Sequence, residues 1–210
     1  MICKSTKKYI KKRAKKENIK IPDDYENILN KYCRIVEEMG YTLKFKKSLN
    51  FPSNKLNANA GFFKNSSIIV TPEWAARLVM YSDEEVHNAF KITLGHELTH
   101  KDNDLCFFKY RVKYYKFIAH VNEVHADFGG AQKMANANRH ILLNAIDYKK
   151  SNKRVDKADS THPSWEQRKY YAENYNFNEA LIQQIAKDVG CKNRDIIDKV
   201  CNHYQEIILN

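Results

Sequence analysis

Residues 96–100 read His-Glu-Leu-Thr-His, a pattern that can bind a metal only if the segment is helical. In an α-helix, residues four apart lie on one face with Cβ atoms roughly 5–6 Å apart, so both imidazoles can reach one zinc ion. Glu97 is then placed to act as general base toward a water molecule that the zinc activates. The pattern predicts one catalytic zinc ion and a hydrolase, most readily one that cleaves peptide bonds.

The flanking residues predict a core helix over 82–102 that offers one edge to a cleft. Its apolar stripe consists of Val86, Phe90, Leu94 and Leu98. A neighbouring stripe of mostly small residues (Ala89, Thr93) leads to His96 and His100. Both stripes have the spacing of a helix with 3.6 residues per turn.

The rest of the chain predicts a mostly helical α+β protein with one small sheet. Apolar periodicity and capping residues indicate helices at about 23–39, 107–135, 137–150, 163–175, 178–189 and 193–208. Short strands are expected at 41–45, 57–63 and 67–71, with a turn at 64–66 between the last two. The 210 residues, 43% of them hydrophobic, suffice for one compact domain with its own core.

A catalytic zinc site needs a third protein ligand, and Glu123 is the best candidate. It follows His100 by 23 residues, enough for a helix to end, turn and return antiparallel. Asp127 lies four residues later on the same face, where it could accept a hydrogen bond from the far ring nitrogen of a ligand histidine. His120 and His125 are competing ligands. The metzincin pattern is excluded, because residues 101–106 supply neither its glycine nor its third histidine.

Residues 160–168, Ser-Thr-His-Pro-Ser-Trp-Glu-Gln-Arg, have two interpretations. As a structural segment they begin a helix with Pro163 at its first position. As a functional segment they place His162 beside the zinc, where it would donate to the oxyanion of the tetrahedral intermediate. Arg168 would support that role or pair with a carboxylate near the ligands. Physical reasoning alone slightly favours the structural interpretation.

Taken together and in order, the segments HELTH, EVHAD and THPSWEQR resemble the HtpX and CAAX-prenyl-endopeptidase family of gluzincin zinc peptidases. The resemblance covers roughly residues 57–175 and implies a zincin-like metallopeptidase domain. It implies ligands at His96, His100 and Glu123, a base at Glu97, and transition-state donors at His162 and Arg168. It also implies a substrate-binding edge strand, which includes Asn57, Ala58, Asn59 and Ala60.

The chain departs from that family in size and setting. The large members are integral membrane proteins, whereas no stretch here approaches 18 consecutive apolar residues, so prenylated or membrane substrates are not implied. We therefore expect a small soluble relative organised as a basic arm (1–20), a zincin-like domain (21–175) and C-terminal helices packed on the same domain (176–210). The absence of an apolar region after the basic N-terminus favours a cytoplasmic location, and the five cysteines are expected to be mostly free thiols.

Most of the net positive charge is concentrated at the N-terminus. Residues 1–20 hold nine basic side chains and one acid, which is +8 of the formal net charge of +11. Such an arm could make weak contacts with nucleic acid or an anionic surface, although a frayed, solvated helix is the simpler interpretation.

Two other functions remain open. The stretch EVHADFGGAQKM is loosely similar to the ImmA-type peptidases, which would imply cleavage of one cognate regulator. The basic arm alone favours a nucleic-acid-binding protein with a non-catalytic zinc site, although a structural site would normally have four cysteine or histidine ligands.

Overall fold

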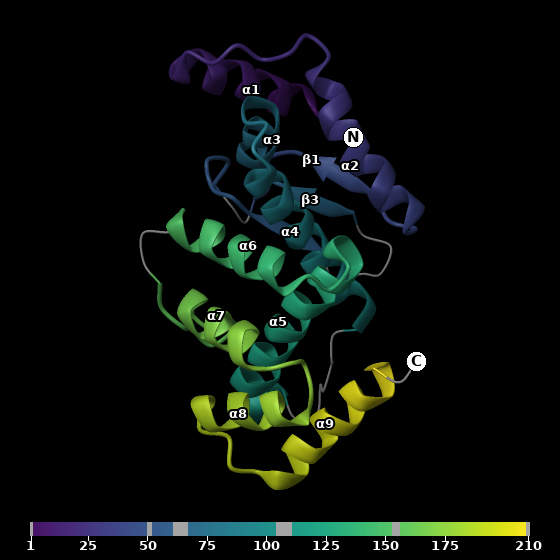
Figure 1. Cartoon of the computed structure of the whole chain (residues 1–210), viewed down its shortest axis with the longest axis vertical. Coiled ribbons are helices and arrows are strands. Elements are labelled where there is room, and N and C mark those ends of the chain that lie inside the picture. The colour runs from purple at the N-terminus through teal and green to yellow at the C-terminus, as the bar shows by residue number, and fades with distance from the viewer. Residues whose placement is uncertain (1, 50–51, 61–66, 104–110, 153–155, 209–210) are drawn as a thin grey trace.

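Helices make up most of the chain, and a small sheet packs among the N-terminal ones (Figure 1). The structure is a computed structural model that describes residues 2–49, 52–60, 67–103, 111–152 and 156–208. The helices are α1 (Lys4–Glu17), α2 (Tyr25–Glu38), α3 (Pro72–Met80), α4 (Glu84–Asn103), α5 (Arg111–Ala135), α6 (Arg139–Ser151), α7 (Trp165–Asn174), α8 (Glu179–Val189) and α9 (Arg194–Ile208). The strands are β1 (Leu43–Phe45), β2 (Ala58–Ala60) and β3 (Ile68–Val70). The predicted α+β, mostly helical class is confirmed.

The sheet has the order β1-β3-β2, which leaves β2 at an edge. β1 runs parallel to β3, whereas β2 pairs antiparallel with it, Ala58 opposite Val70 and Ala60 opposite Ile68. The strand expected over 57–63 is described only as Ala58–Ala60, and the turn expected at 64–66 lies outside the described residues.

N-terminal residues cover the end of the other edge strand, β1. Ile2 forms a parallel bridge with Phe45, and the Cys3 N–H donates to the Phe45 carbonyl at 3.3 Å. The Thr6 hydroxyl donates to the same carbonyl at 2.8 Å. The beginning of the chain is therefore joined to the sheet.

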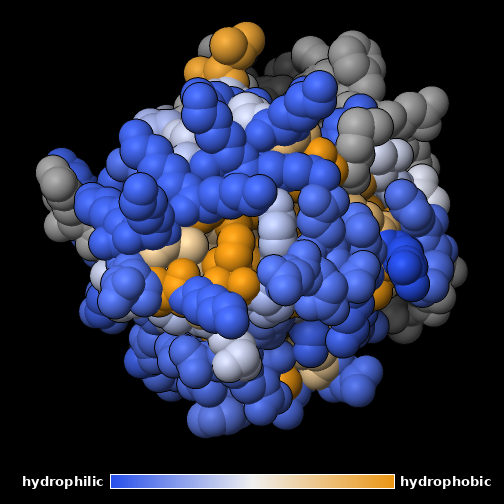
Figure 2. All heavy atoms as spheres, turned by 90° about the horizontal axis from the view of Figure 1, so that it is seen from above, coloured by the Kyte–Doolittle hydropathy of each residue, from blue (hydrophilic) through white to orange (hydrophobic). Residues whose placement is uncertain are grey.

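The basic N-terminal segment is a packed helix, which differs from the frayed, solvated helix that its charge favours. Thr6, Ile10 and Ala14 recur every four residues on one face of α1, and all three are buried. The Tyr9 hydroxyl donates to the buried carboxylate of Glu73 on α3 at 2.7 Å. Seen from the α1 end, the molecule presents a mostly hydrophilic surface (Figure 2).

Glycines let α4 and α5 approach closely. A Cβ atom added to Gly130 would lie 2.7 Å from the backbone nitrogen of His96, and one added to Gly95 would lie 2.6 Å from the Gly130 carbonyl oxygen. A Cβ atom on Gly129 would meet the side chain of Thr99 at 2.5 Å. α5 continues through Gly129-Gly130 to Ala135, so these glycines admit a neighbouring helix without breaking their own.

Two apolar clusters stabilise the described residues. The larger one surrounds the sheet and includes Trp74 and Phe90, with Leu94 from α4. The other joins α5 to α7, α8 and α9 through residues such as Val121 and Tyr204. No helix in the described ranges is both long and apolar enough to cross a membrane. Among these residues Cys3, Cys191 and Cys201 are free thiols, and Cys106 lies outside them.

Candidate metal centre and cleft

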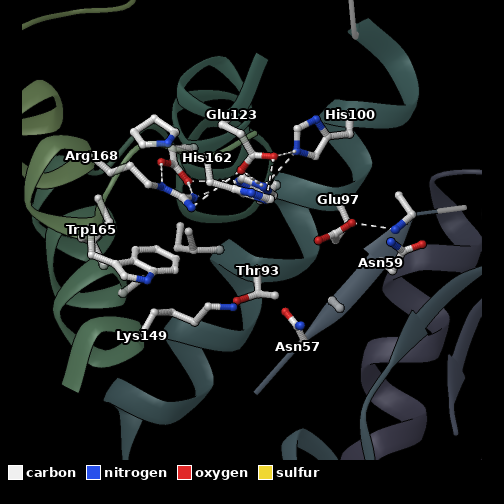
Figure 3. Close-up of a pocket in the computed structure, with 18 of the residues that line it drawn as sticks. Asn57, Asn59, Thr93, Glu97, His100, Glu123, Lys149, His162, Trp165 and Arg168 are labelled. Carbon is white, nitrogen blue, oxygen red and sulfur yellow. Dashed lines mark hydrogen bonds and ion pairs between the residues drawn. The ribbon is translucent and has the colours of Figure 1, made fainter. Parts of the chain in front are cut away.

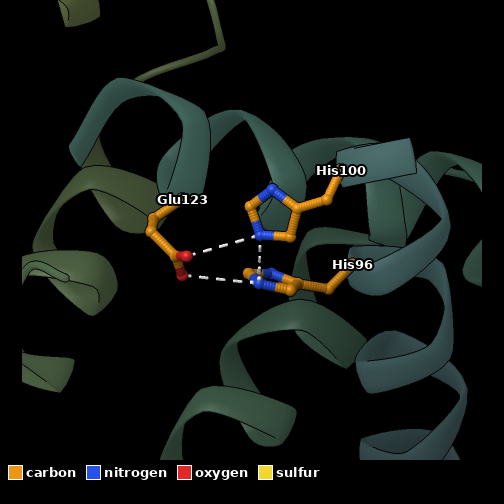
Figure 4. A group of neighbouring side chains, drawn as sticks. All are labelled: His96, His100 and Glu123. Carbon is orange, nitrogen blue, oxygen red and sulfur yellow. Dashed lines mark hydrogen bonds and ion pairs between the residues drawn. The ribbon is translucent and has the colours of Figure 1, made fainter. Parts of the chain in front are cut away.

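His96, His100 and Glu123 meet between α4 and α5 (Figure 4). The two histidines lie one turn apart on α4, and Glu123 reaches them from α5. The Nε2 atoms of the histidines are 2.9 Å apart, and each lies 3.4 Å from one carboxylate oxygen of Glu123. Of the described residues, these three form a group that could hold a metal ion.

The dimensions of this triangle suit one small cation. Ligands bound tetrahedrally at about 2.0–2.1 Å lie about 3.3 Å from one another, close to the 2.9, 3.4 and 3.4 Å found here. Two imidazole nitrogens and a carboxylate form a donor set that a divalent metal accepts. The three residues therefore fit a bound divalent metal ion, such as the zinc ion that the sequence predicts.

Asp127 and Arg168 fix the orientation of His96. Asp127 Oδ1 lies 3.0 Å from His96 Nδ1, and Arg168 Nε donates to Asp127 Oδ2 at 2.7 Å. A second hydrogen bond joins Arg168 Nη2 to Asp127 Oδ1. An ionised carboxylate only accepts, so His96 must donate from Nδ1, which leaves Nε2 as the atom that faces the metal position.

The charges of this cluster stabilise one another. Burial by itself would raise the pKa of Glu123, but hydrogen bonds and attraction from His100 and His96 hold that pKa well below its usual value. Burial would also raise the pKa of Asp127, but the charge of Arg168 and the hydrogen bonds from His96 and Arg168 together lower that pKa. Both carboxylates are thus kept ionised, the state that a metal site requires.

The competing ligand histidines point elsewhere. His120 Nε2 lies 2.9 Å from the carbonyl oxygen of Asp159. His125 packs against Phe177 and Tyr204, with ring centroids 4.7 and 4.5 Å away, and burial lowers its pKa to about 3. Neither belongs to the group that could hold a metal.

Glu97 faces the edge strand. Its carboxylate Oε2 accepts a hydrogen bond from the backbone N–H of Ala60 at 2.6 Å, shown as a dashed line in Figure 3. Glu97 follows His96 on α4, so the same helix turn carries a candidate base and a candidate ligand. The structure thus brings Glu97, the metal-site residues and β2 to one place.

His162 reaches the same site from the loop before α7. Its Nε2 lies 3.4 Å from Glu123 Oε1, and its side chain is 53% exposed. Asp159 Oδ1 accepts from the Thr161 hydroxyl at 2.7 Å and from the His162 N–H at 2.7 Å. Burial would raise the pKa of Asp159, but hydrogen bonds from Thr161 and His162 lower it to about 2. The loop is therefore held by one ionised carboxylate.

Arg168 is enclosed rather than directed into open space. It is 6% exposed, and its guanidinium carbon lies 4.1 Å from the centroid of the Trp165 ring. Its nitrogens contact Asp127 and, at 3.7 Å, Glu123. Of the two roles expected for Arg168, these contacts match pairing with a carboxylate near the ligands.

The start of α7 differs from the expected one. Pro163 is not the first helical position; Ser164 is the N-cap of a capping box with Gln167, and the helix begins at Trp165. The Asp156 carboxylate also accepts from the backbone N–H of Trp165 at 2.6 Å. The Ser-x-x-Gln spacing could have revealed this boundary, whereas nothing in the sequence links Asp156 to it.

These residues line one cleft of about 520 Å³ (Figure 3). The predicted residues that line it are Asn57, Ala58, Asn59, Ala60, His96, Glu97, His100, Glu123, Asp127, His162 and Arg168. Sequence reasoning missed Lys149 and Trp165, which line it from α6 and α7. Both lie on helices in which the spacing of apolar residues distinguishes a buried face from an exposed one but does not indicate a cleft.

No protein-family model, curated protein or solved structure matches this chain.

Replacing Asp127 with asparagine should lower the affinity for a divalent cation about 10- to 100-fold, because an amide holds His96 less firmly and adds no negative charge. The matched control is Asp147→Asn. Asp147 forms an ion pair with Lys169, with 2.7 Å between the charged atoms, and does not line the cleft. Titrations with zinc and cobalt against a chromogenic chelator would measure both variants. Equal affinities for Asp127→Asn and the control would contradict the orienting role.

Proposed function

We propose that this chain is a zinc-dependent endopeptidase in which Glu97 is the general base. The observation that carries the proposal is that a three-ligand group, an adjacent glutamate and an open strand edge line the same cleft. His96, His100 and Glu123 would hold the zinc ion, since two histidines and a glutamate form one of the ligand sets of catalytic zinc. When bound, zinc polarises the scissile carbonyl and lowers the pKa of the attacking water.

Glu97 moves the proton. Its carboxylate would take a proton from the attacking water and deliver it to the amine that leaves when the peptide bond breaks. The hydrogen bond from the Ala60 N–H leaves its other oxygen, Oε1, for that exchange and orients the carboxylate.

His162 would stabilise the negative charge that develops on the carbonyl oxygen. Thr161 donates its hydroxyl hydrogen to Asp159, so the contact of 2.6 Å between that hydroxyl and His162 Nδ1 requires Nδ1 to donate. Nε2 must carry a second proton if it is to donate to the oxyanion. His162 would therefore act as the cationic imidazolium, while Arg168 positions His96 through Asp127.

The edge strand would hold the substrate. The Thr71 N–H donates to the Asn57 carbonyl at 3.0 Å, so Asn57 directs its backbone groups toward β3. Hydrogen bonding alternates along an antiparallel strand, so the backbone of Ala58 and Ala60 is directed toward the open edge. The Ala60 N–H is already used by Glu97. With respect to the residues that the structure describes, the N–H and C=O of Ala58 and the C=O of Ala60 remain for an extended peptide.

Backbone methylation of a peptide substrate should slow its cleavage with a period of two residues. Each N-methyl group that faces β2 removes one hydrogen bond, worth about 0.5–1.5 kcal/mol, so cleavage should fall roughly 2- to 10-fold at alternate positions. A scan with one N-methyl group per peptide, read as kcat/KM, measures this. Peptides methylated beyond the cleft serve as controls, and a uniform response along the peptide would contradict strand pairing.

The proposal as a whole is tested with a diverse peptide library and mass spectrometry. We expect cuts by the zinc-loaded protein, none after treatment with a chelator, and recovery when zinc is restored. If library peptides stay intact and one partner protein is cleaved, the ImmA-like alternative is favoured. Cuts that persist without metal would overturn the zinc mechanism.

A further inference from the structure

The outer face of α1 carries a row of lysines. Lys4, Lys8, Lys11, Lys12, Lys15 and Lys16 are all exposed. Their spacing of 4, 7, 8, 11 and 12 residues from the first places them within about 140° of the helix circumference, at 100° per residue. Within the described part of the chain none of the six has an ion-pair partner. The view from above shows the mostly hydrophilic surface at this end of the molecule (Figure 2).

The acids near α1 neutralise other cations. Lys7 pairs with Glu26 at 2.6 Å. Arg13 pairs with Glu17 and lies 3.4 Å from Glu73. These contacts lie along the sides of the helix that turn toward α2 and α3. The compensating negative charge is therefore at the inner margins, and the outer face keeps its positive charge.

The helix that presents this row is held firmly. Its opposite face buries Ile10 and Ala14 in the core, and the Thr6 hydroxyl bonds to the carbonyl of Phe45. The lysine stems are flexible, but the helix axis is fixed by these contacts. The row thus differs from a disordered basic tail, because its charges stay on one side of the folded protein.

We propose that this face of α1 docks on the phosphate backbone of double-stranded nucleic acid without reading its sequence. Residues 4–16 span about 18 Å at 1.5 Å per residue. One strand of a duplex carries a phosphate about every 3.4 Å along its axis, so a row of this length meets about five phosphates. Lysines that replace condensed counterions there supply a sequence-independent affinity.

The composition of the face favours a duplex over the other polyanions. A helix that binds a membrane buries an apolar face in the lipid, whereas the apolar side chains Ile10 and Ala14 of α1 are already buried in the protein. Binding of single strands relies on aromatic side chains that stack on bases. The aromatic residue of α1, Tyr9, directs its hydroxyl to the buried Glu73.

Docking through α1 would leave the cleft accessible. No residue of α1 is among those that line the cleft. The proposal therefore does not depend on the peptidase activity, and a bound duplex should leave cleavage of a small peptide unchanged.

The test compares two triple variants of equal charge by fluorescence anisotropy with a labelled, mixed-sequence DNA duplex. Lys8, Lys11 and Lys15 are changed to glutamine in one variant; the control changes Lys31, Lys187 and Lys192, exposed lysines on α2, α8 and the loop before α9. At about 0.1 M salt we expect the α1 variant to raise Kd roughly 10- to 100-fold. The slope of the logarithm of the association constant against the logarithm of the salt concentration should fall in magnitude by about 2–3. Each phosphate that a lysine no longer neutralises reduces the magnitude of this slope by about 0.9.

The control variant should retain most of the affinity and the slope. Equal losses in both variants would show that net charge alone binds DNA and would overturn the assignment to α1. Absence of duplex binding by the wild type would also overturn it. Binding of vesicles that contain anionic lipid, with none of the duplex, would replace the nucleic acid with a membrane surface. Thermal unfolding of both variants checks that these exposed substitutions leave the fold intact.

Discussion

Replacing Glu97 with glutamine should lower the rate of peptide-bond hydrolysis by roughly 10²- to 10⁴-fold, the usual contribution of a positioned general base. Glutamine has nearly the same shape and still accepts from the Ala60 N–H, but it cannot take a proton from water. The three candidate metal ligands are unchanged, so the zinc content should stay near that of the wild type. Activity is measured on a peptide that the library identifies, and zinc by elemental analysis.

The matched control for this experiment is Glu85→Gln. Glu85 lies in the first turn of the same helix, is exposed, and does not line the cleft. We expect its activity and zinc content to equal those of the wild type. Turnover retained by the Glu97 variant would refute the mechanism, whereas loss of zinc from that variant would indicate a structural effect instead.

Replacing Gly130 with alanine should separate α4 from α5 and weaken both folding and metal binding. The added Cβ would lie 2.7 Å from the backbone nitrogen of His96, and backbone atoms cannot turn aside as a side chain can. Overpacking of this kind costs about 1–3 kcal/mol of unfolding free energy, only partly offset by the better helix propensity of alanine. Urea denaturation and zinc titration measure the two effects.

The neighbouring glycine supplies the control. In Gly129→Ala the new Cβ meets the side chain of Thr99, which a second substitution, Thr99→Ala, shortens. The double variant should therefore recover much of the stability that Gly129→Ala removes. The same second substitution should not rescue Gly130→Ala. Equal rescue of both would contradict the backbone contact as the cause.

The grouping of the candidate metal ligands follows from helical spacing, a property that can be read from the sequence. His96 and His100 must lie on one face of a helix, and Glu123 and Asp127 share a face of the next one. The structure brings all four together, and Asp127 contacts His96 as the spacing predicts. These positions depend only on the helical repeat and on one antiparallel return.

Contacts made by loops and strand edges could not be predicted in the same way. The hydrogen bond from the Ala60 N–H to Glu97 depends on how β2 pairs with β3. The hydrogen bonds that the Asp159 carboxylate accepts from Thr161 and His162 depend on a loop conformation. The close approach at Gly130 depends on the register of two helices. Each of these contacts depends on the relative positions of two separate segments, and the spacing of residues within one segment does not determine those positions.

The packing of α1 against the core is hard to predict from the sequence for a different reason. Its Thr6, Ile10 and Ala14 repeat is visible in the sequence, but nine basic residues among the first twenty dominate the composition. Charge describes the outer face of this helix and says little about the inner one.

The attachment of the first residues to β1 has a practical consequence for any truncated form of the protein. Ile2 and Cys3 occupy backbone groups of Phe45 at one side of the sheet. Cutting away the N-terminal helix would leave those groups unpaired and uncover apolar side chains beneath it, which invites strand-to-strand association between molecules. Aggregation of a shortened chain would then imitate a loss of nucleic-acid binding. Charge substitutions on the intact chain are therefore the sounder way to distinguish the role of the lysines on α1 from the role of this helix in folding.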